Sequence, residues 1–519
     1  MNVSTEISRR QLLQGAVGGA LLLGTSGAVG GIASSVAGAS SSPKKGGTLR
    51  AGIAGGSSSD TMNALTPIQT TDFARTLNLF EMLTVYGPTG KVEYLLAESM
   101  VPNATATAWT IHLRPGVTWH NGKKFTADDV IYTFRRITNP KSPMPGAPLL
   151  ARVNVAGMRK LNDLTVYVPC HTPYSTLNEA LAGWYFNIVP VGYDPKKPIG
   201  TGPFKAHSFT PGVESVFLRN ENYWQSGLPY VDELIIQNYA SETSQINALT
   251  ANQVDVIDAL SAVSISAVKK GGGKVWIAKT SGFTPLYMRR DTAPFNNVNV
   301  TQAMRYVVDR PQMLDVIFGG HGIVGNDIYD HADPAYDRAI PQRVQDISKA
   351  KYLLKKAGHE NLQVTLTAGP IGPGTVQLAQ VFAQQASAAG IKVNIDLVTP
   401  EVEFGPNYAK FLFAQDYVIY TSYLTQTALS GLATSPFPET HFSNAKYTGL
   451  FNQALATTNI KKRYDLEHEM QLIDWNEGGN IIPYFLPTID GYRSHVHGIE
   501  SSVTGWPLGA FNFKSMWLS

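Results

Sequence analysis

Cysteine and charge are both scarce in this sequence. Its 519 residues include one cysteine, Cys170, so no disulfide can form within the chain. Charged residues make up 16% of the chain, below the ~25% of an average soluble domain. No cluster of Lys and Arg has the density of a nucleic-acid or anionic-membrane site, and the short run Lys461–Arg463 is predicted to be a solvated helix face. The composition therefore argues against nucleic acid as a partner.

Motifs for catalysis and for cofactors are also missing. Residues Gly320–Gly325 spell G-x-G-x-x-G, but they follow a segment with helical spacing, Gln302–Phe318, whereas a dinucleotide site follows a strand. Lys269–Lys274 lacks the Ser or Thr of a phosphate-binding loop. No second histidine follows His468 at the spacing of a zinc protease. We therefore expect a loop at Gly320–Gly325, no cofactor and no enzymatic activity.

Two histidines, His495 and His497, are candidates for one metal site. Residues two apart on a strand point to the same face, so both imidazoles could bind one ion. The alternative is that both are surface or packing residues, which is the commoner role of such pairs.

The N-terminus has the pattern of an export signal. Ser8–Leu13 resembles the twin-arginine motif, an apolar Gly/Ala-rich region follows to about Val36, and Ala37–Ala39 gives a small-x-small cleavage site. We expect cleavage near Ala39, with retention as a membrane anchor as the alternative. Because Cys170 lies outside the leader, it cannot carry an N-terminal lipid, and we expect a periplasmic protein.

The clearest local pattern lies between Trp109 and Ile137. Trp109–Leu113 alternates apolar and polar residues, which predicts a half-buried strand. Asn121-Gly122 can adopt the positive φ values of a tight hairpin turn. Thr126 and Asp129 have the spacing of a capping box, which predicts a helix start. That helix should bury one stripe, formed by Val130, Phe134 and Ile137.

This stretch resembles the signature of the family 5 extracellular solute-binding proteins, the peptide, nickel and oligosaccharide receptors of ATP-driven importers. The matching segments are Leu113-Arg114, Gly116-Val117, Trp119–Gly122 and Thr126–Val130. Further matches occur in the order and spacing of that family at Gly46–Leu49, Ile199–Phe204, Arg219–Trp224 and Tyr230–Leu234. The resemblance covers essentially residues 46 to 519.

The length and the resemblance together predict several domains. The chain of 519 residues exceeds the ~250–300 at which one core stops growing. The resemblance implies an α/β fold with mixed α+β lobes: a two-lobed periplasmic binding protein with hinge strands and an extra inserted domain. The hinge strands are expected near Gly282–Arg290 and Trp475–Tyr484. The expected parts are a signal peptide (1–39), a linker (40–47), domain I (48–85, 190–281 and 481–519), an inserted domain II (86–189) and domain III (282–480).

The residues after Ser348 predict a βαβ unit without reference to any family. An amphipathic pattern ends at Gly358, and two strand patterns, Gln363–Thr367 and Lys392–Val398, flank a helical pattern at Thr375–Ala389. Such a unit joins two parallel strands through a right-handed crossover.

The resemblance implies capture of a small ligand by hinge closure and its delivery to an ABC permease, with ATP hydrolysed by other subunits. We expect a monomer. One alternative is an enzyme, such as a hydrolase, on the same scaffold. Another is a receptor that signals to a sensor or chemotaxis protein.

The ligand chemistry depends on residues 416–430. In peptide-binding members an acidic residue after a Gly-Trp pair binds the ligand's ammonium group, but the corresponding stretch, Ser422–Gln426, has no carboxylate. Because a buried cation needs a counter-charge, a free peptide N-terminus would require another partner. We expect an aromatic, hydroxyl-lined cleft that suits sugars, amides or modified peptides. The expected ligand contacts are Ser58, Ser59, Phe283, Tyr420, Ser422, Tyr423, Thr425 and Tyr484, although the chain has 23 tyrosines and core packing is the alternative for each.

Overall fold

The computed structural model describes residues 42–519, and its largest sheet contains the first strand, β1 (Thr48–Ala54). The export signal predicted at residues 1–39 lies outside the described residues. In the eight-stranded sheet the order is β12-β19-β11-β1-β10-β9-β8, and β14 pairs with β19. The other strands are β8 (Phe204–Thr210), β9 (Glu214–Arg219), β10 (Glu233–Tyr239), β11 (Val256–Ile257), β12 (Lys274–Phe283), β14 (Ile323–Val324) and β19 (Tyr484–Tyr492).

A second sheet has five strands in the order β16-β15-β17-β13-β18. Its strands β15 and β16 run parallel and flank α9, which confirms the predicted βαβ unit. A separate core packs around this sheet, and it includes Leu366, Phe382 and Phe413. The bounds are β13 (Leu286–Met288), β15 (Gln363–Ala368), β16 (Lys392–Leu397), β17 (Phe413–Gln415), β18 (Asn480–Ile481), α8 (Ile347–Lys356) and α9 (Thr375–Ser387).

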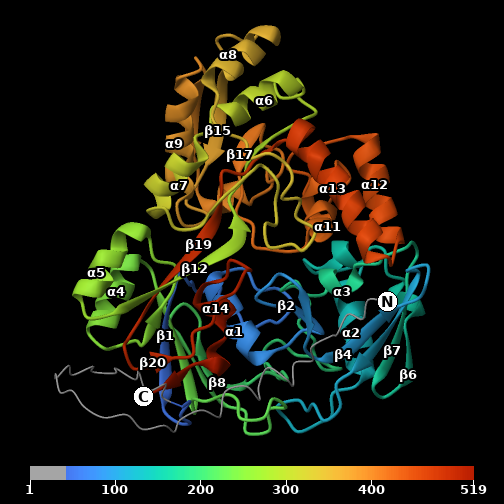
Figure 1. The fold of residues 1–519 in the computed structure, drawn as a ribbon. Helices are drawn as coiled ribbons and strands as arrows, with labels where there is room; N and C mark the ends of the chain where they lie inside the picture. The colour runs from blue at the N-terminus through green and yellow to red at the C-terminus, as the bar shows by residue number, and fades with distance from the viewer. Residues whose placement is uncertain (1–41) are drawn as a thin grey trace, which may run out of the picture. The chain divides into compact units, whose positions relative to one another are not determined.

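Two direct strand-to-strand connections link these sheets, and both fall within the ranges expected for hinge strands. Strand β12 leads directly into β13, and β18 leads directly into β19. Strands β12 and β19 lie side by side (Figure 1) and pair antiparallel from Lys274 with Tyr492 to Lys279 with Pro487. The register then shifts before the last pair, Phe283 with Phe485.

The third sheet confirms the predicted strand and helix between Trp109 and Ile137. It has the order β4-β5-β7-β6, and α2 packs on β6 and β7. Thr126 and Asp129 form the capping box of α2, and the predicted stripe of Val130, Phe134 and Ile137 is fully buried. The bounds are β4 (Ala97–Pro102), β5 (Ala108–Leu113), β6 (Arg159–Asn162), β7 (Thr165–Pro169) and α2 (Ala127–Ile137).

The helical pattern at Gln302–Phe318 is not one helix but two, α6 (Val298–Tyr306) and α7 (Arg310–Phe318). The break has a local cause, because Pro311 has no N–H to donate and the Asp309 side chain caps α7 by accepting from Gln312 N. The G-x-G-x-x-G segment after α7 contains only the short strand β14 and starts no helix. The segment therefore does not join a strand to a helix, as predicted, but the expected loop is interrupted where Ile323 and Val324 pair with β19.

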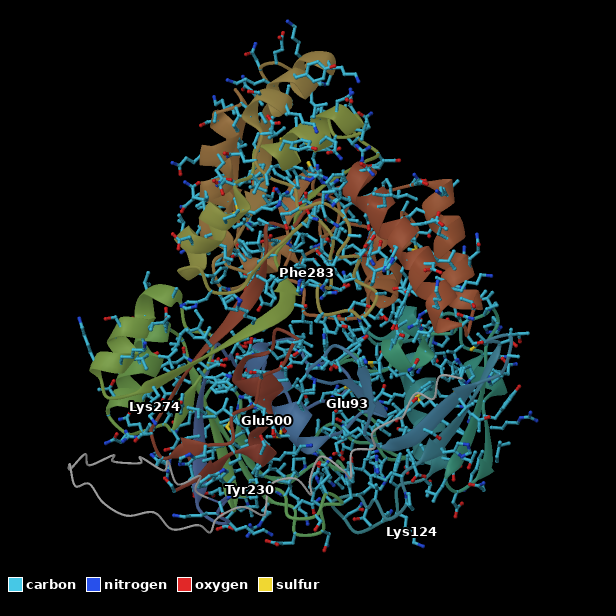
Figure 2. The ribbon with its side chains drawn as sticks, in the orientation of Figure 1. Glu93, Lys124, Tyr230, Lys274, Phe283 and Glu500 are labelled. Atoms are coloured by element: carbon cyan, nitrogen blue, oxygen red, sulfur yellow. The ribbon has the colours of Figure 1, made fainter. Side chains whose placement is uncertain are left out.

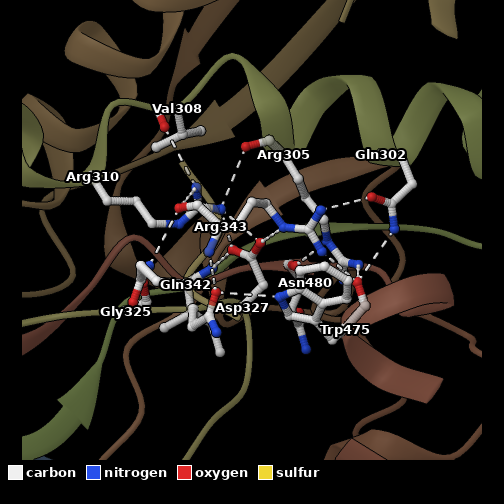
Figure 3. A network of polar contacts seen from close by, with 12 residues as sticks. Gln302, Arg305, Val308, Arg310, Gly325, Asp327, Gln342, Arg343, Trp475 and Asn480 are labelled. Atoms are coloured by element: carbon white, nitrogen blue, oxygen red, sulfur yellow. Dashed lines mark hydrogen bonds and ion pairs between the residues drawn. The ribbon is translucent and has the colours of Figure 1, made fainter. Parts of the chain in front are cut away.

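A buried charge network holds α6 and α7 to the segment before β18 (Figure 3). Arg310 donates to both carboxylate oxygens of Asp327, at 2.7 and 2.6 Å, and Arg343 Nε donates to the same residue at 2.8 Å. Two guanidinium groups therefore share one carboxylate, and Arg343 also donates to Trp475 O at 2.5 Å. The network ties residues from four separate segments into one structure.

The remaining elements include two two-stranded sheets, Thr84–Tyr86 with Val92–Tyr94 and Val496–His497 with Trp517–Leu518, and further helices. They are α1 (Thr70–Leu79), β2 (Thr84–Tyr86), β3 (Val92–Tyr94), α3 (Leu177–Ala180), α4 (Glu242–Thr250), α5 (Ile265–Lys270), α10 (Pro400–Glu403), α11 (Tyr423–Gln426), α12 (Ala445–Ala456), α13 (Ile460–Glu477), α14 (Pro507–Phe511), β20 (Val496–His497) and β21 (Trp517–Leu518). Within residues 42–519, no helix combines the length and the apolar character needed to cross a membrane.

The prediction of a solvated face at Lys461–Arg463 is wrong for one residue. Lys461 lies at the surface of α13, with its side chain 85% exposed. Arg463 instead points toward α3, and its side chain is 12% exposed because it pairs with Glu179.

Candidate functional site

A cavity of about 470 Å³ lies between β2, the end of α1 and the segment 500–515. Ile419 and Tyr420, which follow β17 of the five-stranded sheet, also line it. Its charged lining residues include Glu93 and Glu500, labelled in Figure 2, and Lys514. A cavity of this size is typical of a site for a small organic ligand.

Aromatic side chains form one wall of this cavity. Trp184 and Trp506 line it, and each has its ring centroid 4.5 Å from that of Phe73. Tyr185 lies against Trp184, with a centroid separation of 3.4 Å. Rings in this arrangement offer flat surfaces on which sugar, amide or aromatic groups stack. Neither tryptophan was among the predicted site residues, because neither lies in a recognisable motif.

The strand β2 and the segment after β17 touch beside the cavity. The Tyr86 hydroxyl accepts from Ser422 N at 3.0 Å, and the Tyr86 and Tyr420 rings are 4.9 Å apart. The Tyr420 hydroxyl donates to Gly90 O at 2.9 Å. Burial raises the pKa of Tyr86, so its hydroxyl stays neutral and can accept this bond. Two of the expected ligand contacts, Tyr420 and Ser422, therefore lie where the elements around the two sheets meet.

The other hydroxyl residues of the expected set lie in two places. Ser422 and Thr425 share a 2.9 Å hydrogen bond at the start of α11, and both are buried. Ser58 and Ser59 are exposed in the turn after β1. Eight residues were expected to contact the ligand, and one of these eight, Tyr420, lines the cavity.

The expected aromatic contacts other than Tyr420 are buried among side chains. Phe283 ends β12, where its ring stacks on that of Tyr329 at 6.2 Å. Tyr423 donates to Asp474 Oδ2 at 2.9 Å and is fully buried. Tyr484 belongs to the core of the five-stranded sheet, where its ring meets Phe318 and its hydroxyl has no partner. A role for these three in ligand binding stays a prediction.

Although the stretch Ser422–Gln426 has no carboxylate, an acidic residue follows the end of β17, the central strand of the five-stranded sheet. Asp416 directly follows β17 and accepts from the Tyr408 hydroxyl at 2.7 Å, and the same hydroxyl lies 3.4 Å from Glu439. Burial raises the pKa of both carboxyls, and the proximity of Asp416 raises that of Glu439 further. Burial raises the pKa of Tyr185, and the charge of Asp416 raises it further.

The two histidines considered for metal binding already have protein partners. His495 Nε2 lies 3.0 Å from Asp255 Oδ1, and the ring of His497 stacks on Trp517 with centroids 4.1 Å apart. Across residues 42–519, no group of three or more His, Cys, Asp or Glu side chains is arranged to hold a metal ion. The packing interpretation accounts for both histidines.

Several known proteins resemble this chain. Heme-binding protein A of Haemophilus influenzae is 26% identical over 431 residues, which cover 74% of this chain and 77% of the relative. The dipeptide-binding protein of Escherichia coli is 24% identical over 81% of this chain and 85% of its own. The fold matches the periplasmic binding protein DppA of Helicobacter pylori in complex with a peptide, with a TM-score of 0.77 and 20% identity over 92% of this chain and 98% of that one.

The sequence profile named "Bacterial extracellular solute-binding proteins, family 5 Middle" matches residues 91–448, which is more than half of the chain. The match includes the strand, turn and capped helix between Trp109 and Ile137. This chain therefore belongs to the family 5 bacterial extracellular solute-binding proteins.

Proposed function

We propose that the protein captures a small ligand at the aromatic cavity and presents its closed form to an ABC importer. The observation that carries this proposal is the direct contact of Tyr86 with Ser422 and Tyr420 beside the cavity. A ligand held between β2 and the segment after β17 contacts both only when these two parts of the chain lie against each other. Its binding free energy therefore shifts the hinge equilibrium toward closure.

The cavity supports a ligand with flat or amide-rich surfaces. Trp184, Trp506 and Tyr420 offer stacking, and the neutral tyrosine hydroxyls offer hydrogen bonds. A peptide-like, modified-peptide or oligosaccharide ligand fits this lining. The names of the relatives, which bind heme and dipeptides, support a similar range for this chain.

Family membership indicates a protein that works outside the cytoplasm, in the periplasm, with permease and ATPase subunits of an importer. We further propose that it is a monomer, that the twin-arginine route exports it and that it makes and breaks no bonds in its ligand. The last point is supported by membership of a family of solute-binding proteins.

The test is native mass spectrometry of the protein purified from its own periplasm. We expect a bound small molecule whose removal and return change the hydrodynamic radius reversibly, without chemical change in the molecule. A protein that carries no small molecule, or one that converts it to a product, would contradict the proposal.

A further inference from the structure

The four-stranded sheet carries no hinge strand, yet it lies against helices of the lobe that is built on the five-stranded sheet. We use the name four-stranded unit for residues 97–180, which contain β4 to β7, α2 and α3. Its last helix, α3, lies beside α12 and α13 (Figure 1). These two helices belong to the lobe of the five-stranded sheet, because α13 leads directly into β18. The four-stranded unit therefore contacts that lobe directly.

On its other side the four-stranded unit is held to the segment before β8 of the eight-stranded sheet. His120 N donates to Gly200 O at 2.9 Å, and Gly200 N donates to His120 Nδ1 at 3.1 Å. The second ring nitrogen, Nε2, donates to Gly202 O at 3.0 Å. Burial lowers the pKa of His120 to about 4, so the neutral ring can both accept and donate. Opening of the hinge would therefore move the four-stranded unit together with the eight-stranded sheet, away from α12 and α13.

Polar contacts join the four-stranded unit to both helices. Ser175 N donates to Leu455 O at 2.9 Å, and Ser175 Oγ donates to Ala454 O at 3.0 Å. Both carbonyls belong to the last turn of α12, where a helix leaves its carbonyl groups without partners of its own. Glu179 pairs with Arg463 of α13 at 2.7 Å. The unit thus caps the end of one helix and forms an ion pair with the other.

Apolar side chains fill the same contact. Phe451 and Leu455 of α12 are buried, and they belong to one cluster with Leu149 and Leu177 of the four-stranded unit. The guanidinium group of Arg152 lies over the Phe451 ring, 5.6 Å from its centroid. Separation of the lobes would expose this apolar surface to water, which is unfavourable.

We propose that the four-stranded unit is a latch, which docks on α12 and α13 and keeps the lobes closed while no ligand is bound. Helix capping, an ion pair and buried apolar side chains hold the latch, and each of these contacts forms without a bound molecule. This inference rests on the hinge closure of the proposed function. It adds that the closed state is the main state without ligand, and that a ligand enters through a minor open state. Apparent affinity then rises with the strength of the latch, because less binding free energy is used to close the hinge.

The latch also adjoins the wall of the cavity. Helix α3 ends at Ala180, and the lining residues Ala182–Trp184 follow it. The hydroxyl of Tyr86, another lining residue, donates to Glu179 O at 2.8 Å. Docking of α3 on α13 therefore sets the position of this wall, while the side chains of Ser175 and Glu179 contact the helices.

Small-angle X-ray scattering on the full mature protein tests the latch, with samples in which native mass spectrometry detects no bound small molecule. We expect the wild-type curve to match the curve calculated from the closed structure. Ser175→Tyr inserts a bulky side chain between the unit and α12, which fits only when the lobes part. The radius of gyration of this variant should therefore shift to a larger value. Arg152→Ala combined with Glu179→Gln removes side-chain contacts to both helices without added bulk and should shift the radius in the same direction.

Ser142→Tyr is the matched control, because Ser142 is an exposed serine of the same unit. It should leave the scattering curve unchanged. The inference is overturned if the wild-type protein without small molecule already has the radius of Ser175→Tyr. It is also overturned if Ser175→Tyr and the double variant both keep the wild-type radius while their melting curves show them folded.

The double variant decides the question if Ser175→Tyr does not fold, because it adds no bulk to the contact. A protein that carries no small molecule when it is purified from its own periplasm would contradict the proposed function. The scattering comparison would still decide whether the latch exists, since it uses the protein without ligand.

Discussion

Arg463 of α13 lies 2.7 Å from Glu179 of α3, and the two side chains are 12% and 14% exposed. The pair joins two helices that are far apart in the sequence. Arg463 also lies 3.3 Å from Glu467 of its own helix, so Glu179→Gln removes one of its two acidic partners. Because this contact is largely buried, we expect the substitution to lower the free energy of unfolding by about 1–3 kcal/mol in urea denaturation.

The same helix provides the control for that substitution. Lys461 and Asp465 also form an ion pair, at 3.1 Å, but their side chains are 85% and 61% exposed. We expect Asp465→Asn to change the free energy of unfolding by under about 0.5 kcal/mol. Equal effects of the two substitutions would show that the α3–α13 pair does not stabilise the fold.

Gly90 has no room for a side chain. A Cβ atom there would lie 2.2 Å from Ala332 O, and its φ of 75° is in the left-handed region. Gly116 has a similar φ of 80° but nothing within 4 Å. We expect Gly116→Ala to lower the free energy of unfolding by about 1–2 kcal/mol, because its backbone is strained. Gly90→Ala should lower it more, because the added Cβ also clashes with Ala332 O. It should weaken ligand binding as well, because the Cβ would lie close to the hydroxyl of the cavity residue Tyr420. Thermal melts and titration with the co-purified ligand measure the two effects.

The buried tyrosines give a matched pair of substitutions. Tyr423→Phe removes a hydrogen bond to the buried Asp474 and should destabilise the protein by about 1–3 kcal/mol. Tyr484→Phe removes a hydroxyl that has no partner, so it should be neutral or stabilising. Denaturant titrations of both variants test this difference, which disappears if the Tyr484 hydroxyl is hydrogen-bonded in solution.

Asp490 should make stability fall as pH rises. Its pKa is about 8 in the folded protein, above the ~3.9 of an unfolded aspartate. The folded state therefore binds the proton more tightly. The stabilisation that Asp490 contributes through its raised pKa is fully present below about pH 4 and is lost as the pH rises through about 8. Asp490→Asn should flatten that part of the stability profile in melts between pH 5 and 9, and an unchanged slope would contradict the shifted pKa.

Trp506 should contribute directly to ligand affinity. Replacing it with Ala removes a stacking surface from the cavity, and we expect a loss of about 1–3 kcal/mol in binding the co-purified ligand. Tyr352→Ala on the exposed side of α8 is the control, because Tyr352 is 64% exposed and far along the chain from any lining residue. Equal affinities of the two variants would place the ligand elsewhere.

Local patterns were enough to predict much of the fold. The capping box at Thr126 and the strand and helix patterns between Gln363 and Leu397 depend on neighbouring residues, and the structure has them as expected. The break at Asp309 was missed because the hydrophobic spacing continues across it, although Pro311 was a visible signal.

The site could be predicted only in part. Tyr420 and Ser422 lie in a segment that the family resemblance identifies. Phe73, Trp184 and Trp506 come together through packing of distant segments. A single sequence does not encode such pairings as a local pattern, so these residues could not be recognised beforehand.

The register shift between Lys279 and Phe283 separates two mechanical roles within the paired strands β12 and β19. Before the shift, the ladder anchors both strands in the eight-stranded sheet. After it, a few residues carry the chain to the five-stranded sheet and can change their torsion angles without breaking that ladder. Under the hinge closure proposed above, the pivot would therefore be short and have a stiff base, so that a small rotation at Phe283 would become a large displacement at the far end of the five-stranded sheet.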